Sequence, residues 1–173
     1  MFCVDGLKGF RESINAVFPK SQIQRCIIHQ IRSSTRYVNY KDIKALMADL
    51  KKVYQAVSED EALNALVQFK ENWQNKYPSC VRSWDENWDI LSTFFAYPAE
   101  IRKIIYTTNI IEGLNRQFRK ITKNKPSFTN DDSLRKMLYL ASKNIVDRWT
   151  VACRNWDVVS NHLRIMFEDR ESA

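Results

Sequence analysis

Two acidic side chains could carry chemistry, and the first of them is Asp5. It follows the apolar run Phe2–Val4 and precedes Gly6, as at the end of a buried strand that runs into a turn. A carboxylate in that place can be held rigidly and still be exposed at a sheet edge. Asp-Gly is also among the commonest turn dipeptides, and the residues alone favour that simpler role.

The second acidic candidate, Glu112, lies near the start of a predicted helix. Thr107-Thr108-Asn109 is a helix N-cap signal, and the helix should run from 110 to about 123. With Asn109 as the cap, Glu112 would be the third helical residue, where it could close a capping box or pair with Arg116 at i+4. Spacing by itself therefore does not make Glu112 a site.

The helix that follows Glu112 carries a row of cations. They recur at intervals of three and four residues and so share a face, and one further lysine follows them: Arg116, Arg119, Lys120, Lys123 and Lys125. From 98 to 125, seven basic residues stand against two acids, a net charge of +5 in 28 residues. This face suits a phosphate backbone, although a solvated stripe has the same spacing. Gly113, in the first turn, costs of order 1 kcal/mol against alanine, which the close approach of DNA or another protein chain would explain.

Two other pairs have both a chemical and a structural interpretation. Cys26 and His29 could lie on one side of a helix, but without a second pair zinc is disfavoured, and packing or hydrogen bonding is favoured. Trp84 and Trp88 lie one helical turn apart in an aromatic-rich segment. Base stacking would require an exposed ring beside a basic groove, so burial in the core is favoured. The same segment, through Tyr97, could instead mediate self-association.

The elements that must position these residues are two short strands and many helices. We predict strands at 2–4 and 21–28, with a helix between them at 8–18, and a further helical stretch through 31–38. Helical spacing continues almost throughout 41–106, where Pro78 and Pro98 divide the block. Two closing helices are predicted at 131–148 and 156–167, after a loop at 124–130.

Composition places these elements in a globular protein. The 173 residues suffice for one domain with a core, and no apolar run approaches the roughly 18 residues of a membrane span. Three glycines are too few for a glycine-rich phosphate loop, which argues against a nucleotide cofactor. The four scattered cysteines predict reduced thiols in a cytoplasmic protein, and the net charge of +7 indicates an anionic partner.

The chain resembles the Mutator-type transposases of bacterial insertion sequences over essentially its whole length. The most specific segment is Tyr106-Thr-Thr-Asn-Ile-Ile-Glu112-Gly-Leu-Asn115-Arg-Gln-Phe-Arg-Lys120, reinforced by Asn155-Trp156. The other matching segments are Val4-Asp5-Gly6 to Phe18-Pro19, Cys26-Ile-Ile-His29 with Arg32, and Tyr77-Pro78 to Trp84 and Trp88. We assign structural roles to the motif residues Cys26, His29, Arg32, Asn109 and Asn115. Gly113 departs from the small polar residue that is more usual in the family.

The resemblance implies an RNase H-like core with three catalytic acids, Asp, Asp and Glu, and an all-helical insertion between the last two. By position, Asp5 is similar to the second aspartate and Glu112 to the closing glutamate. Residues 1–40 would be the residual core, 41–106 the insertion and 107–173 the closing helices, in one continuous globular unit. Only the last two of five strands can be present, so the helices must supply most of the burial, or a partner chain must complete the sheet. We therefore expect a mainly α fold with a short N-terminal β portion.

The resemblance also implies the chemistry. In such enzymes three carboxylates hold two Mg²⁺ or Mn²⁺ ions about 4 Å apart, for cleavage and strand transfer of double-stranded DNA at insertion-sequence ends. The first aspartate and the DNA-recognition region precede residue 1 in such a fold, so we expect this chain to be inactive alone. Association with the bacterial nucleoid and with further copies of the chain is also expected. The alternative is a non-catalytic nucleic-acid-binding or self-association remnant of a decayed transposase.

Overall fold

The structure is a computed structural model that describes residues 1–106, 109–125, 127–150 and 155–168. It divides into two compact units, Met1–Tyr106 and Thr107–Ala173, and each is described by itself. The boundary falls where the predicted closing segment begins, so the first unit contains both the predicted residual core and the predicted insertion. The sequence had led us to expect one continuous unit.

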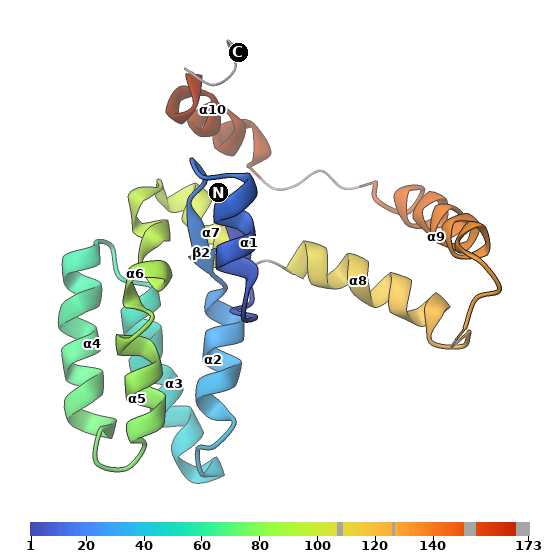
Figure 1. Cartoon of the computed structure of the whole chain (residues 1–173). Coiled ribbons are helices and arrows are strands. Elements are labelled where there is room, and N and C mark those ends of the chain that lie inside the picture. The colour runs from blue at the N-terminus through green and yellow to red at the C-terminus, as the bar shows by residue number, and fades with distance from the viewer. Residues whose placement is uncertain (107–108, 126, 151–154, 169–173) are drawn as a thin grey trace. The chain divides into compact units, whose positions relative to one another are not determined.

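The first unit is a strand–helix–strand motif followed by a helical block (Figure 1). Its elements are β1 (Phe2–Val4), α1 (Phe10–Val17), β2 (Ile23–Arg25), α2 (Ile27–Thr35), α3 (Tyr40–Tyr54), α4 (Glu59–Trp73), α5 (Pro78–Asp85), α6 (Trp88–Leu91), η1 (Thr93–Ala96, a 3₁₀ helix) and α7 (Ala99–Tyr106). The two strands are parallel, with Phe2 paired to Ile23 and Val4 to Arg25. A mainly α fold with a short β portion is thus confirmed.

Local signals in the sequence set several element ends. Ser58 caps α4, because its Oγ accepts a hydrogen bond from the Glu61 backbone N–H at 3.2 Å. Pro78 lies in the first turn of α5, where its missing N–H removes no helical bond. The second strand is shorter than predicted because Cys26 serves both elements. Its N–H donates to the Val4 carbonyl at 2.7 Å, and its own carbonyl accepts from Gln30 N–H at 3.0 Å, so the helix starts directly after the strand.

Helices provide the core of the first unit. α3 packs along α4, and the side chains of Leu46, Leu50 and Phe69 are fully buried between them. Trp84 from α5, Leu91 from α6 and Phe94 from η1 extend this core toward the sheet, each with 2% or less of its surface exposed. At about 25 cal/mol per Å² of apolar surface, these large side chains supply far more burial energy than six strand residues could.

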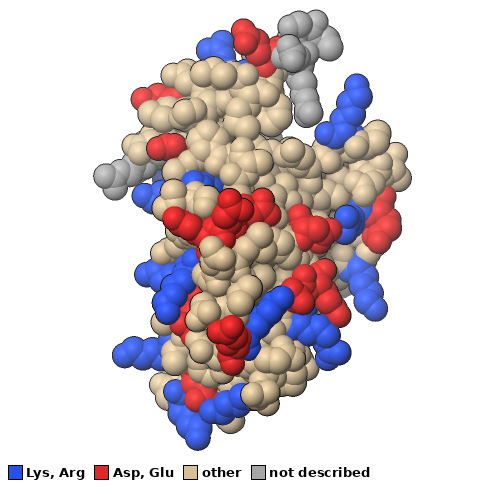
Figure 2. All heavy atoms as spheres, turned by 90° about the vertical axis from the view of Figure 1, so that its left-hand side faces the viewer, with Lys and Arg blue, Asp and Glu red and all other residues tan. Residues whose placement is uncertain are grey.

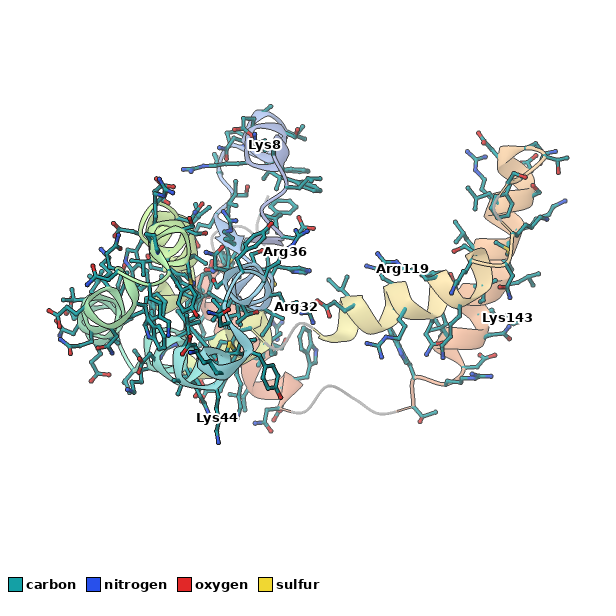
Figure 3. All side chains as sticks on the ribbon, turned by 90° about the horizontal axis from the view of Figure 1, so that it is seen from below. Lys8, Arg32, Arg36, Lys44, Arg119 and Lys143 are labelled. Atoms are coloured by element: carbon teal, nitrogen blue, oxygen red, sulfur yellow. The ribbon has the colours of Figure 1, made fainter. Side chains whose placement is uncertain are left out.

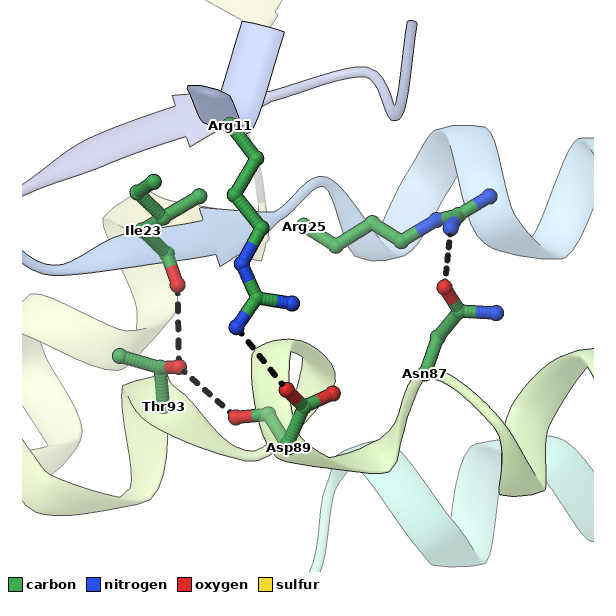
Figure 4. Close-up of polar contacts among 6 residues, drawn as sticks. All are labelled: Arg11, Ile23, Arg25, Asn87, Asp89 and Thr93. Atoms are coloured by element: carbon green, nitrogen blue, oxygen red, sulfur yellow. Dashed lines mark hydrogen bonds and ion pairs between the residues drawn. The ribbon is translucent and has the colours of Figure 1, made fainter. Parts of the chain in front are cut away.

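The sheet is attached to the helical block through β2. Gln24 is fully buried, and its side-chain amide donates to the carbonyl of Leu91 at 3.0 Å. The Thr93 hydroxyl donates to the Ile23 carbonyl at 3.1 Å, and Arg11 of α1 pairs with Asp89 at 3.4 Å (Figure 4). The Tyr97 hydroxyl also bonds the Gln22 side chain. The strand pair is therefore fixed by polar contacts from α6 and η1 as well as by its own ladder.

The second unit contains α8 (Asn109–Thr122), α9 (Asp131–Val146) and α10 (Trp156–Met166). α8 packs on α9, and Asn130 caps α9 by accepting from the Ser133 backbone N–H at 2.9 Å. Among the described residues of this unit, only Ala141, Ile145 and Val159 are buried, so its core is small. No described helix in either unit is long and apolar enough to cross a membrane.

Replacing Gln24 with leucine tests the attachment of the sheet. The variant Gln24→Leu leaves the buried Leu91 carbonyl without its donor, so we expect a loss of about 1–3 kcal/mol in the free energy of unfolding, measured by urea denaturation. The exposed Gln74 supplies the matched control, and Gln74→Leu should change stability by less than about 0.5 kcal/mol. Equal stability of the two variants would contradict the structural role of Gln24.

Candidate active site

Asp5 directly follows β1, and its side chain is exposed. Its Oδ1 accepts a hydrogen bond from the Leu7 backbone N–H at 3.3 Å, which is the turn geometry that Asp-Gly favours. The turn role that the sequence suggests is therefore present. It does not compete with a chemical role, because the carboxylate is both held by the backbone and accessible at the carboxyl end of a parallel strand.

Arg25, a residue that sequence analysis did not single out, packs across the Asp5-Gly6 turn. Gly6 has a φ of +79°, and a Cβ placed there would lie 2.9 Å from Arg25 Cζ. The Arg25 Nη1 donates to Asn87 Oδ1 at 2.5 Å (Figure 4). Burial lowers the pKa of Arg25, and the negative charge of Asp5 acts in the opposite direction. A fixed cation thus stands beside the Asp5 carboxylate and links it to the helical block.

Glu112 lies in the first turn of α8 and is partly exposed. The helix begins at Asn109, one residue earlier than predicted, so Asn109 is a helical residue; the other predicted cap residues, 107 and 108, lie outside the described part of the chain. At about 100° per residue, Glu112 falls on the same face as four cations that follow it. These are Arg116, Arg119, Lys120 and Lys123, all of them exposed, as are Asn115 and Lys125. The carboxylate therefore stands at the head of an exposed basic face.

Cys3, Cys26 and His29 form another cluster in the first unit. Cys3 pairs with Gln24, and Cys26 comes two residues later, so both sulfurs lie on one face of the sheet. The hydrogen bond from the Cys3 thiol lowers the pKa of Cys26; burial acts against it, and His29 lowers the pKa further. The same bond, followed by burial, raises the pKa of Cys3. Neither cysteine forms a disulfide, and nor does Cys80. Arg32 lies one helical turn beyond His29 and is exposed.

The structure confirms the favoured core position of Trp84 and is incompatible with base stacking by this residue. Its ring has no exposed surface, and its indole N–H donates to the Ser34 hydroxyl at 2.8 Å inside the core. Trp88 is half-buried and packs against Phe95, with ring centroids 6.4 Å apart. Because Phe94 and Tyr97 are also buried, this aromatic segment supports the fold and offers little surface for self-association.

Asp5 belongs to the first unit and Glu112 to the second, and within the described residues no group of three or more His, Cys, Asp or Glu side chains is placed to hold a metal ion.

Residues 1–152 match the family model described as "Transposase, Mutator family". The chain belongs to this family. A transposase for insertion sequence element ISRM3 from Rhizobium meliloti is 41% identical over 168 residues, which is 96% of this chain and 42% of that protein.

Other relatives extend the comparison to distant bacteria. A probable insertion-sequence transposase of Corynebacterium diphtheriae is 42% identical over 84% of this chain and 43% of its own length. The transposase of IS905 from Lactococcus lactis is 36% identical over 78% of this chain and 34% of its own length. The chain thus spans less than half of the length of these curated relatives.

Gly6 and Gly113 form a matched pair for testing the Asp5 turn. Gly6→Ala places a Cβ against Arg25 at a positive φ, so we expect a loss of about 1–3 kcal/mol in the free energy of unfolding. Gly113 is helical with nothing within 4 Å of an added Cβ, so Gly113→Ala should stabilise the chain by up to about 1 kcal/mol. Thermal and urea unfolding measure both changes, and destabilisation by Gly113→Ala would contradict the open space beside it.

The hydrogen bond from Cys3 to Cys26 predicts that the Cys26 thiol ionises at a lower pH than an ordinary cysteine. The pKa of Cys26 in the folded state lies below the ordinary value of about 8.5. The Cys26 thiolate therefore contributes fully to the free energy of unfolding above about pH 8.5, and this contribution is lost as the pH falls through the folded-state pKa. At neutral pH, Cys26→Ser should remove ultraviolet thiolate absorbance, and Cys3→Ala should raise the pH at which Cys26 ionises. Unchanged absorbance in both variants would show that no thiolate is present.

Proposed function

We propose that this chain is part of the catalytic portion of an insertion-sequence transposase, in which Asp5 and Glu112 are ligands of a divalent-metal site that cleaves and joins DNA strands. The observation that carries the proposal is the position of Glu112, one turn ahead of an exposed basic face, in a chain of the Mutator family. A carboxylate that binds metal in such a site must lie close to the bound phosphates. On α8, the Glu112 carboxylate and the cations that could bind phosphates share one face.

The strand–helix–strand motif supports an RNase H-like assignment for the N-terminal segment. β1 and β2 are parallel and joined by α1, and Asp5 stands where β1 ends. Ligand-binding groups commonly lie at the carboxyl ends of parallel strands. Cys3 and Phe2 on β1 are exposed, so β1 has a side on which further strands could be added. The two strands would then be the last two of a larger mixed sheet.

The chemistry of the donors fits Mg²⁺ or Mn²⁺. Both candidate ligands offer carboxylate oxygens, which such hard cations prefer. When bound as a pair, these ions activate a water or a 3′-hydroxyl and stabilise the leaving oxygen of a phosphodiester. The role of the protein is positional: the Leu7 N–H orients Asp5, and Arg25 keeps a positive charge beside it. The cations of α8 would hold the DNA backbone alongside.

Metal-directed cleavage of the polypeptide tests whether Asp5 and Glu112 bind the same ions. With Fe²⁺ in place of Mg²⁺, ascorbate and peroxide generate radicals that cut the backbone near the metal. We expect fragments from cuts near residue 5 and near residue 112, detected by mass spectrometry, and we expect Asp5→Asn or Glu112→Gln alone to weaken both cuts. Asp60→Asn, an exposed acid of α4, is the control. If each variant lost only its own cut, the two carboxylates would not form one site.

A non-catalytic role in DNA binding is the second candidate, and the exposure of all five cations from Arg116 to Lys125 favours it. It predicts binding that weakens with salt and proceeds without metal-dependent nicking. Reversing two charges, Arg116→Glu with Lys120→Glu, should lower the affinity for duplex DNA and reduce its dependence on salt, as measured by fluorescence anisotropy. An unchanged affinity and salt slope would exclude this face from DNA binding.

A further inference from the structure

The positive charge of this chain has a second concentration, in the first unit. Residues 25–52 contain seven basic residues and two acids, a net charge of +5 in 28 residues, which equals the excess that surrounds α8. The segment comprises the end of β2, all of α2 and most of α3. The six basic residues on the two helices and the turn between them are exposed, and one of them, Lys52, pairs with Asp49: Arg32, Arg36, Lys41, Lys44, Lys51 and Lys52.

The two acids in this segment bond largely to side chains outside it, although Asp49 also pairs with Lys52 of the same segment. Asp42 accepts from Tyr77 at 2.5 Å and pairs with Lys76 at 2.7 Å, and these contacts, Lys76 foremost, lower its pKa. Burial raises the pKa of Asp49, but bonds from Lys52, Trp73 and Asn72 outweigh it, so its pKa is also lowered. Both carboxylates therefore bond to partners that include side chains of α4 and of the turn before α5.

Charge is distributed unequally over the helical block. Residues 59–89, which form α4, α5 and the start of α6, contain seven acids and three basic residues, a net charge of −4. Figure 2, which looks at the side of the unit formed by α4, shows acidic and basic side chains interspersed across that face. In Figure 3, Arg32 and Arg36 extend from α2 on the side away from α4, and Lys44 extends from α3 at the lower edge. The excess of positive charge thus belongs to α2 and α3, whereas α4 to the start of α6 has a negative net charge with both signs present.

Two exposed aromatic side chains lie among the cations. Tyr37 and Tyr40 stand at the α2–α3 turn with 80% and 93% of their surfaces exposed. The Arg36 guanidinium lies 5.5 Å from the Tyr37 ring centroid. Neither ring is needed for the core, and a phenol at the surface can donate its hydroxyl to a phosphate oxygen. Cations three and four residues apart on a helix, about 4.5–6 Å along its axis, match contacts to neighbouring backbone phosphates.

We propose that the outer face of α2 and α3, which we call the α2–α3 surface and which contains Arg32, Arg36, Tyr37, Tyr40, Lys41 and Lys44, binds the phosphate backbone of double-stranded DNA. The inference rests on the proposed function in taking DNA as the partner, but it requires neither Asp5 nor Glu112 to bind metal. It gives the first unit a DNA contact of its own, separate from α8. Because only phosphates are contacted, the binding is independent of base sequence.

The test measures how the affinity of the whole chain for a labelled duplex of arbitrary sequence depends on salt, without divalent metal. In Arg36→Glu with Lys44→Glu, the slope of log affinity against log salt should fall in magnitude by about 2, one unit for each lost phosphate contact. The control, Lys20→Glu with Arg82→Glu, makes the same change in net charge at exposed positions outside the surface and should keep the slope of the unmodified chain.

Neutral substitution guards against a folding defect. Arg36→Gln with Lys44→Gln should lose the same slope while its circular dichroism and unfolding midpoint stay unchanged. The proposal is overturned if the reversed pair keeps the original slope, if the control pair loses as much, or if the unmodified chain does not bind DNA. It is also overturned if poly-glutamate competes as well as DNA at equal charge, since the partner would then be an acidic protein. None of these outcomes bears on the metal-directed cleavage at Asp5 and Glu112, so the two proposals can fail separately.

Discussion

The anchoring of β2 to the helical block is the contact on which the position of Asp5 depends. A two-stranded sheet is marginal in water by itself, and six strand residues bury little apolar surface. Here β2 is held from outside its ladder, because the buried amide of Gln24 reaches the Leu91 carbonyl and the Thr93 hydroxyl reaches the Ile23 carbonyl. β1 is then held by β2, and Asp5 follows β1. The position of Asp5 therefore depends on the contacts of β2 with α6 and η1.

The charged side chain of Arg25 also connects the Asp5-Gly6 turn with the helical block. Its guanidinium touches the Asp5-Gly6 turn at one end and the Asn87 side chain at the other, and Asn87 in turn donates to the Ser83 carbonyl of α5 at 2.7 Å. The helical segment that the resemblance predicts to be an insertion therefore helps to support the candidate site. Through this polar chain, α5 helps to hold the Arg25 guanidinium against the Asp5-Gly6 turn.

Sequence patterns predicted both strands, the helical block and the closing helices, because apolar periodicity reports which faces are buried. They predicted element ends less well: the second strand is shorter because Cys26 already belongs to the first turn of α2. They favoured the core for both tryptophans, and the packing of α5 confirms this for Trp84, whereas Trp88 is only half-buried. Arg25 was missed because its contacts, with Gly6 and Asn87, are distant in sequence. The α2–α3 surface was missed for a similar reason. The acids that seem to balance that surface, Asp42 and Asp49, bond partners on other elements, and those partners are distant in sequence.

The contacts that fix β2 also set an order of events during folding. They join residues that are 62 to 75 positions apart in the sequence, whereas α3 and α4 are neighbours that can pair as a local hairpin. Long loops close slowly and are costly in entropy before their contacts form. During synthesis, β2 precedes the side chains and carbonyl that fix it, which lie between Asn87 and Tyr97. The strand pair therefore reaches its fixed position on the helical block only after the segment from α6 to Tyr97 is in place.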